Sequence, residues 1–415
     1  MSHSENVVEL LHAGQFDQMA TEIEKALQVD SAELLADLAE YLSMMGFSSE
    51  SRQVYEAISQ ENTANTDIIL NLAEMKVDDG DLDGALALLY QVASTDDNYV
   101  AALVMIADLY QLDGVWEAAL EKLQEASTLS DSPLVSFAIA ELHYNQANWQ
   151  EAIDYFAKLS QRQILELTKV SIYQRIGTAY ASLGEFENAE KFLEKSLEIN
   201  HDDTVLFELA QISAVLGEHK RAIDYFKQLD ALAPDFDGYA YPYAQALIEE
   251  NEFDSAFAVA KDGLSKNPTD VPLLHLTSRI AYALHDLKAS ETYLVQALDL
   301  AELHDETIFL LSNLYLLQAD YEAVINLAPL LDDDHALARW NIAKAYGELE
   351  QDKEALAIYD EINQSVLADN PEFLLDYAHI LIRNGRASDA KLSLTQYLAS
   401  VPDDENAQEL FNELI

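Results

Sequence analysis

Apolar residues recur at spacings of three and four along most of the chain, in paired segments separated by short polar turns. The segment from Tyr173 to Ser196, YQRIGTAYASLGEFENAEKFLEKS, has the clearest pattern. Such spacing places the apolar side chains on one face of an amphipathic helix. The glycine at position 184 interrupts the pattern in the middle. The segment therefore predicts two antiparallel helices joined by a turn at Gly184.

The pattern around Gly184 returns along the whole chain at intervals of 31 to 37 residues. We call the residue equivalent to Gly184 in each repeat the turn residue. The twelve turn residues are Gly14, Gly46, Gly80, Gly114, Ala147, Gly184, Gly217, Asn251, His285, Ala319, Glu350 and Gly385. A period of this length predicts an array of helical hairpins, each of which buries its apolar face against its neighbours.

Two positions in each repeat carry small side chains. The first, seven residues before the turn residue, holds Ala39, Ala73, Ala107, Ala140, Gly177, Ala210, Ala244, Ser278, Ser312, Ala343 and Ala378. The second, five residues after it, holds Ser51, Ala85, Ala119, Ala152, Ala189, Ala222, Ala256, Ser290, Val324, Ala355 and Ala390. Only Val324 is not small. We predict that the two helices of each hairpin cross most closely at these two positions, where a large side chain would force the backbones apart.

The same residues resemble the signature of the tetratricopeptide repeat, W-x2-L-G-x2-Y followed by A-x3-F, which has a period of 34. The matching residues in the clearest repeat are Tyr173, Ile176, Gly177, Tyr180, Ala189 and Leu193. The resemblance implies an all-α fold, a right-handed superhelix (α-solenoid) of about twelve antiparallel helix-turn-helix units. In length, acidity and lack of other motifs, the chain is also similar to cytoplasmic tetratricopeptide proteins of Gram-positive bacteria.

The ends of the repeats are marked by proline. Pro234, Pro268 and Pro402 each fall seventeen residues after a turn residue, where proline ends a helix without breaking its interior. We predict that residues 1–403 form the repeat array and that residues 404–415 form a C-terminal capping helix. One interval is three residues too long, and we place the insertion within residues 161–169 and predict a hinge or kink there.

The charge balance bears on the choice of partner. The chain carries 75 acidic and 23 basic residues, a formal net charge of −52, which argues against direct nucleic-acid binding and fits either a basic partner or simply a well-solvated surface. Residues 1–157 hold only four basic side chains against 29 acidic ones. The absence of cysteine, of a basic and apolar leader and of a long apolar run predicts a cytoplasmic protein that does not insert into membranes.

A search for catalytic chemistry gives little. Asp79, Asp81, Asp83 and Gly84 match the opening of a calcium loop, but the twelfth position is Tyr90 where the loop requires glutamate. The ten histidines show no metal-ligand spacing, and no nucleophile elbow, Walker loop or dinucleotide fingerprint occurs. We therefore predict no enzyme activity, no catalytic residue, no metal site and no cofactor.

The first helix of each repeat is expected to line a concave groove, with the residues ten and six before the turn residue facing it. In the N-terminal half, the position six before holds what we call the acidic ladder: Glu40, Glu74, Asp108 and Glu141. In the C-terminal half, the same position holds Gln211, Gln245, Arg279, Asn313 and Lys344. The position ten before holds aromatic or planar side chains: Phe137, Phe207, Tyr241, His275, Phe309 and Trp340. The alternative is that each aromatic ring packs against the neighbouring first helix.

Three function classes remain open. The leading hypothesis is a protein-interaction scaffold or adaptor that binds a protein segment or peptide in its groove, with the acidic half taking Lys or Arg side chains and the other half taking apolar anchors. The alternatives are a peptide-sensing regulator and an acidic decoy of a nucleic-acid-binding protein. The oligomeric state is not determined by the sequence.

Overall fold

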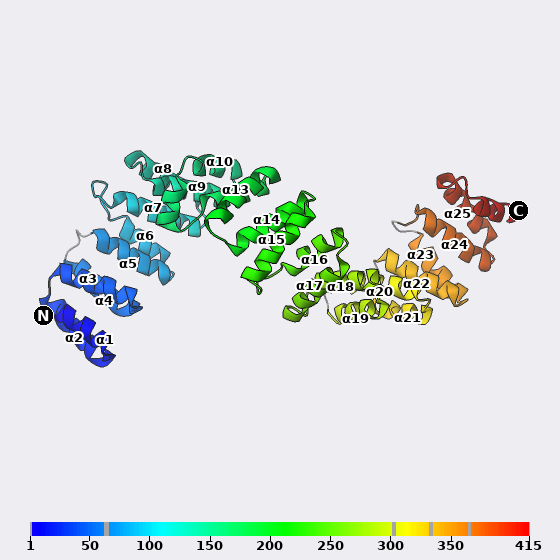
Figure 1. Ribbon diagram of the computed structural model, residues 1–415, viewed down its shortest axis with the longest axis horizontal. Helices are drawn as coiled ribbons and strands as arrows, with labels where there is room; N and C mark the ends of the chain where they lie inside the picture. Colours follow the sequence, from blue (N-terminus) through cyan, green and yellow to red (C-terminus); the bar gives the residue numbers. More distant parts are fainter. Residues whose placement is uncertain (1, 62–65, 301–303, 332–334, 364–366, 415) are drawn as a thin grey trace. The chain divides into compact units, whose positions relative to one another are not determined.

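The protein is built from α-helices arranged as antiparallel hairpins (Figure 1). The computed structural model describes residues 2–61, 66–300, 304–331, 335–363 and 367–414. Within these ranges the chain contains 26 α-helices, one short 3₁₀-helix and no β-strand. The predicted all-α class and the array of twelve helical hairpins are confirmed.

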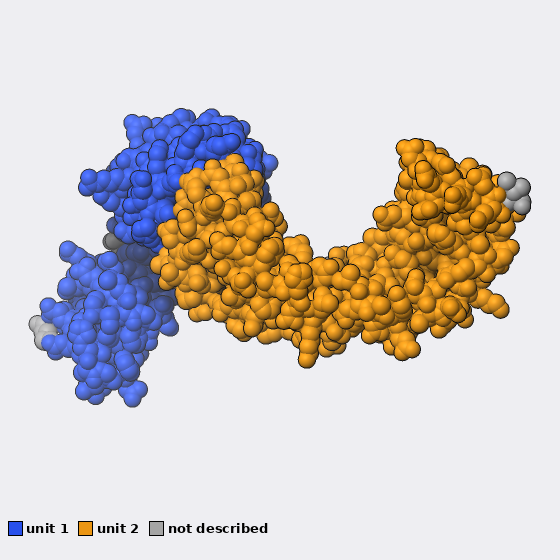
Figure 2. All heavy atoms as spheres, turned by 45° about the vertical axis from the view of Figure 1, so that its right-hand side comes forward, with its two compact units in different colours: residues 1–201 blue, residues 202–415 orange. Residues whose placement is uncertain are grey.

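The chain divides into two compact units, residues 1–201 and 202–415 (Figure 2). The hairpins of unit 1 are α1 (His3–His12) with α2 (Phe16–Val29), α3 (Ala32–Met44) with α4 (Ser48–Glu61), α5 (Thr66–Asp78) with α6 (Leu82–Leu89), α7 (Tyr99–Leu112) with α8 (Trp116–Leu129), α9 (Pro133–Asn145) with α10 (Trp149–Phe156), and α12 (Ile172–Ser182) with α13 (Phe186–Ile199). The extra helix α11 spans Gln161–Thr168.

Unit 2 continues with six more hairpins, and its surface curves around a hollow in Figure 2. Its hairpins are α14 (Asp203–Val215) with α15 (His219–Leu232), α16 (Ala240–Glu249) with α17 (Phe253–Lys266), α18 (Val271–Ala283) with α19 (Leu287–Leu298), α20 (His304–Leu317) with α21 (Tyr321–Asn326), α22 (Ala336–Glu348) with α23 (Asp352–Ile362), and α24 (Pro371–Arg383) with α25 (Ala387–Ser400). The last helix, α26, spans Glu405–Glu413 and packs on α25.

The turn residues all adopt the left-handed backbone conformation. All twelve have a positive φ, from 55° at Ala319 to 84° at Gly46. In the clearest repeat, the N–H of Gly184 donates to the carbonyl of Ala181 and the N–H of Glu185 donates to the carbonyl of Tyr180. This pair of bonds is the Schellman motif, which satisfies the last carbonyls of a helix and reverses the chain. The spacing of the turn residues therefore reflects one backbone conformation repeated twelve times.

The two small positions of a hairpin meet, as predicted. The hydroxyl of Ser51 donates to the carbonyl of Ala39 at 2.6 Å, and the Oγ atoms of Ser278 and Ser290 lie 2.8 Å apart. A Cβ atom added to Gly177 would lie 3.2 Å from the carbonyl oxygen of Ala189 and 2.6 Å from a carbon of the Leu193 side chain. Small side chains are required here because the paired helices approach closely.

Two repeats depart from the common form. The inserted residues form α11, which ends at Lys169 in a left-handed conformation with a φ of 64°. In the repeat whose second small position is Val324, the second helix α21 has only six residues and passes into a 3₁₀-helix, Ala328–Leu330. Pro329 lies in that 3₁₀-helix and cannot donate an N–H to a longer α-helix. A hinge at 161–169 stays a prediction.

None of the helices in the described ranges combines the length and the apolar character needed to cross a membrane.

Candidate binding groove

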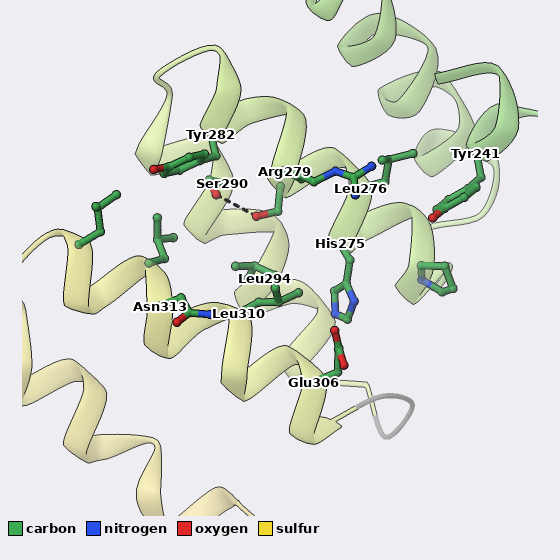
Figure 3. A pocket seen from close by; sticks show the side chains of 14 residues that line it. Tyr241, His275, Leu276, Arg279, Tyr282, Ser290, Leu294, Glu306, Leu310 and Asn313 are labelled. Atoms are coloured by element: carbon green, nitrogen blue, oxygen red, sulfur yellow. Dashed lines mark hydrogen bonds between the residues drawn. The ribbon is translucent and has the colours of Figure 1, made fainter. Parts of the chain in front are cut away.

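A cavity of about 700 Å³ opens in unit 2 between the first helices of two adjacent hairpins, α18 and α20 (Figure 3). Leu294 and Ser290 of α19 form its floor, and Tyr241 of α16 lies at one end. Four of the predicted groove residues line this cavity: Tyr241, His275, Arg279 and Asn313. The remaining lining residues are Pro272, Leu276, Ser278, Tyr282, Glu306, Leu310, Leu314 and Leu317.

The lining combines apolar surface with few polar groups. Tyr282 is 45% exposed and Leu317 60% exposed, although both lie beside this cavity. His275 is half-buried, its Nε2 lies 2.8 Å from the hydroxyl of Thr307, and burial lowers the pKa of its imidazole. Burial thus favours the neutral imidazole, and Arg279 is the permanently charged cation among the residues that line this cavity.

A register rule relates adjacent hairpins. In three pairs of adjacent hairpins, the residue six before the turn residue of one repeat interacts with the residue nine before the turn residue of the next. Glu141 bonds to Arg175 in this way, with Oε1 and Nε 2.9 Å apart, and Asn341 donates its amide to Asn313 at 2.8 Å.

A third pair, Lys344 and Asp376, follows the same rule. Burial raises the pKa of the Asp376 carboxyl, and the charge of Lys344 opposes that rise. At these two positions of the repeat, long polar side chains on neighbouring first helices can reach each other.

The rule explains which rungs of the acidic ladder remain unpaired. The residues opposite Glu40, Glu74 and Asp108 are Asn71, Met105 and Ala138, none of which is basic. All three acidic side chains are exposed, and none has an ion pair within the part of the chain that the structure describes. Glu141 differs because Arg175 neutralises it.

The four basic side chains of residues 1–157 do not reach the ladder. Each is held by an acidic neighbour elsewhere: Lys25 by Glu22, Arg52 by Asp79, Lys76 by Asp81 and Lys122 by Glu125. The charge of Glu40, Glu74 and Asp108 is therefore uncompensated among the described residues. Burial raises the pKa of the Tyr55 hydroxyl most, and the negative charges of Glu40 and Glu74 raise that pKa further. Both carboxylates therefore lie near this one tyrosine.

The environment of Asp108 perturbs its carboxyl. The residue keeps exposed surface, but the surrounding protein removes enough water from its carboxyl to raise the pKa from 3.8 to about 6. The only hydrogen bond to its carboxylate among the described residues comes from the amide of Gln111 at 3.1 Å. Burial without a compensating charge accounts for this direction of the shift.

Replacing Asp108 by asparagine is expected to flatten part of the pH dependence of stability. Because the folded-state pKa is raised, the folded protein binds more protons than the unfolded chain between about pH 4 and 6. The wild-type protein therefore loses stability as pH rises through this window, because the desolvated Asp108 carboxyl ionises. The Asp108→Asn variant has no carboxyl at this position and is not expected to show this loss of stability. Thermal unfolding of both proteins across pH should give a difference in midpoint that favours the variant and grows up to about pH 6.

The exposed residue Glu117 supplies the control, since Glu117→Gln removes one charge without a desolvated carboxyl. A midpoint difference between wild type and Asp108→Asn that is constant across pH would contradict the assignment.

The aromatic side chains at the position ten before the turn residue pack more than they were expected to. Phe137, Phe207 and Phe309 are partly buried, and their rings lie 5.1 to 6.4 Å from rings of Phe156, Phe226, Phe236 and His335. Trp340 is only 6% exposed, and its Nε1 donates to Asp376 at 3.1 Å. It is part of the core and does not present its ring to a groove. The reason is that Phe373 and Lys344 cover it.

The other predicted residues are dispersed. Gln211 and Gln245 are exposed on α14 and α16. Lys344 lies 4.1 Å from the centre of the Trp340 ring and lines a second cavity, of about 670 Å³, together with Asp376, His379 and Arg383. Of the residues predicted for the C-terminal half of the groove, four therefore line the first cavity and Lys344 alone lines the second.

Sequence reasoning missed one column of groove residues. Leu276 and Leu310, nine before their turn residues, line the cavity, as do Tyr282 and Glu306. The column could have been found from charge pairing, because Glu141 and Arg175 are opposite in sign one repeat apart.

Models of tetratricopeptide families match four parts of the chain. Repeats described as YpiA-like match residues 111–164, and YpiA-like C-terminal tetratricopeptide repeats match residues 337–404. A general tetratricopeptide repeat matches residues 170–203, and the ARM repeat of tetratricopeptide repeat protein 21 matches residues 5–113. The chain is a tetratricopeptide-repeat protein. Such proteins generally act as protein-interaction scaffolds and are typically not enzymes.

The tetratricopeptide-repeat protein resembles those of Gram-positive bacteria. It is 28% identical over 341 residues to the TPR repeat-containing protein YpiA of Bacillus subtilis (strain 168), a match that covers 81% of this chain and 80% of the relative. Among solved structures, the Cut9–Hcn1 hetero-tetramer of APC/C aligns at 14% identity over 100% of this chain and 97% of that chain, with a TM-score of 0.39. The MamA RS-1 ArsTM double mutant aligns at 20% identity over 44% of this chain and 94% of that chain, with a TM-score of 0.35.

The described residues of this tetratricopeptide-repeat protein hold no group of three or more His, Asp or Glu side chains placed to bind a metal ion. The calcium-like segment is a helix turn instead. Asp81 caps α6 (Leu82–Leu89) by accepting from the N–H of Gly84 at 3.0 Å, and it also accepts from Lys76.

Proposed function

We propose that the protein is a non-enzymatic interaction scaffold that binds an extended segment of a partner protein in the cavity between α18 and α20. The observation that carries this proposal is the apolar surface that unit 2 leaves open there. Tyr282 and Leu317 are exposed beside an apolar wall of Leu276, Leu310 and Leu314. Exposed apolar surface of this kind is costly in a soluble protein unless a partner covers it.

The acidic ladder supports a second contact in the same proposal. Glu40, Glu74 and Asp108 supply uncompensated negative charge from three successive hairpins of unit 1. Such a row attracts a segment that carries Lys or Arg and speeds its association at low salt. A decoy of a nucleic-acid-binding protein would use this charge alone, and a peptide-sensing regulator would use the cavity alone.

The experiment is affinity capture from the native cell extract with the full-length protein, quantified by mass spectrometry. The double variant Tyr282→Ala/Leu317→Ala is expected to capture at least about tenfold less of a partner than wild type, because central aromatic and apolar contacts dominate the binding energy. Leu392→Ala is the matched control, since Leu392 is 64% exposed on α25 and lies outside the cavity.

Salt and a second variant separate the alternatives. The charge-driven decoy would be favoured by one combination of results. The partner would be lost at high salt and from the variant Glu40→Gln/Glu74→Gln/Asp108→Asn, but the cavity variant Tyr282→Ala/Leu317→Ala would still capture it. Glu24→Gln/Glu33→Gln/Glu117→Gln removes the same charge from exposed positions outside the ladder and is its control. Equal capture by wild type and both binding variants would refute the proposed scaffold surfaces.

A further inference from the structure

Arg279 differs from every other arginine of this acidic protein. The chain has eight arginines, and seven of them form ion pairs with carboxylates: Arg52, Arg162, Arg175, Arg221, Arg339, Arg383 and Arg386. Arg279 has no ion pair and no hydrogen bond to any described residue. In a chain with a net charge of −52, an unpaired guanidinium in a cavity is an exception that requires a reason.

The register of the hairpins leaves Arg279 unpaired. The residue opposite it, nine before the next turn residue, is Leu310, where the equivalent contact elsewhere joins Glu141 to Arg175. Glu306 lines the same cavity, but it lies two helical turns before Asn313, the residue equivalent to Arg279. Two turns separate them by about 10 Å along the helix axis. Figure 3 accordingly shows Glu306 beside His275, with Arg279 farther along α18.

Asn313 adds a directed donor on the opposite wall. Its Oδ1 accepts from the amide of the buried Asn341 at 2.8 Å, and Asn341 also donates to Ser312 at 2.9 Å. This contact fixes which end of the Asn313 amide carries oxygen, so its Nδ2 is the end left to donate. The cavity therefore offers a guanidinium on α18 and an amide donor on α20, and the one carboxylate among its lining residues, Glu306, lies toward the other end.

We propose that this cavity binds an Asp or Glu side chain within a partner segment, together with a large apolar side chain next to it in that segment. The carboxylate accepts from the Arg279 guanidinium, which suits its two oxygens, and from the Asn313 amide. The adjacent apolar side chain packs on Leu276, Leu294 and Leu310, with Tyr282 along its side. This assignment rests on the proposed function and specifies the chemistry of the segment that the cavity accepts.

A single carboxylate fits better than a polyanion. The field of a chain with a net charge of −52 repels nucleic acid, and one guanidinium flanked by leucines cannot neutralise a row of phosphates. Leucines line much of the cavity wall, which favours an amphipathic segment with one local charge.

The test is selection of random-sequence peptides, displayed with both ends blocked, on the full-length wild-type protein. Wild type is expected to enrich segments that place Asp or Glu beside Leu, Phe, Tyr or Trp. Synthesised versions of these peptides should bind Arg279→Gln roughly ten- to hundredfold more weakly, because a charge-assisted hydrogen bond is lost. Replacing the peptide's Glu by Gln should produce a similar loss on wild type and little further loss on Arg279→Gln.

Lys288→Gln is the charge-matched control, because Lys288 is exposed on α19 in the same hairpin and is not part of the cavity lining. This inference would be overturned, and the proposed function left intact, by selection of peptides without acidic residues. Such peptides would bind Arg279→Gln as tightly as wild type and would fail to bind Tyr282→Ala/Leu317→Ala. Selection of peptides that are unaffected by either variant would overturn both. Selection of phosphorylated peptides over their Glu counterparts, in a parallel arm, would replace the carboxylate with phosphate.

Discussion

Replacing Phe373 by alanine is expected to lower the free energy of unfolding by about 3–5 kcal/mol. Phe373 is fully buried on α24, and its ring lies 5.5 to 5.8 Å from the rings of Trp340, Tyr359 and Tyr377. Removing the ring takes away contacts with three aromatic side chains from α22, α23 and α24 and leaves a cavity that rigid helices cannot close. Both the lost burial and the cavity contribute to the cost.

The loss should be local, because each hairpin of a repeat array contacts mainly its neighbours. Hydrogen exchange is expected to increase first in α22–α25, and urea denaturation followed by circular dichroism measures the total loss. Leu392→Ala on the exposed face of α25 is the control. If Phe373→Ala cost no more than Leu392→Ala, the aromatic cluster would not be part of a packed core.

Replacing Ser278 by leucine is expected to cost about 2–4 kcal/mol and to abolish binding in the cavity. Ser278 and Ser290 are buried where α18 and α19 cross, and their hydroxyls lie 2.8 Å apart. A leucine there separates the two helices and leaves the Ser290 hydroxyl buried without this partner. Overpacking and an unsatisfied polar group both destabilise the hairpin.

Thermal unfolding measures this effect, and Ala283→Leu, at an exposed position of the same helix, is the control. The variant Ser278→Ala separates the two causes, since it removes the hydroxyl without adding volume. A midpoint for Ser278→Leu equal to that of Ala283→Leu would mean that the helices do not cross closely at this pair.

Much of the fold could be predicted because its determinants are local. Gly184 and its eleven equivalents occupy a single backbone conformation, and glycine adopts it without strain. Positions such as Ala39 and Ser51 must be small in every hairpin, so they leave a period in the sequence that survives variation elsewhere. The unequal repeats were also visible as a long interval and as Val324, although the six-residue length of α21 was not.

The groove was predictable only in part. Tyr241, His275, Arg279 and Asn313, four of the residues that the periodicity predicted for the groove, line one cavity, because residues at equivalent positions of successive first helices project in the same direction. It could not separate side chains that face solvent from those that another helix covers. Trp340 and Tyr241 share a position in the repeat, yet Trp340 is 6% exposed and Tyr241 is 36% exposed.

The sequence alone determined the helices, their turns and the closeness of each pair, since these depend on backbone conformation and side-chain volume at fixed spacings. The tertiary structure alone decided which charges remain unpaired. Arg175 and Arg279 are both arginines of first helices, but Glu141 reaches one of them and Leu310 lies opposite the other. That difference arises from contact across adjacent hairpins, where each side chain's surroundings are set by packing rather than by its neighbours in the chain.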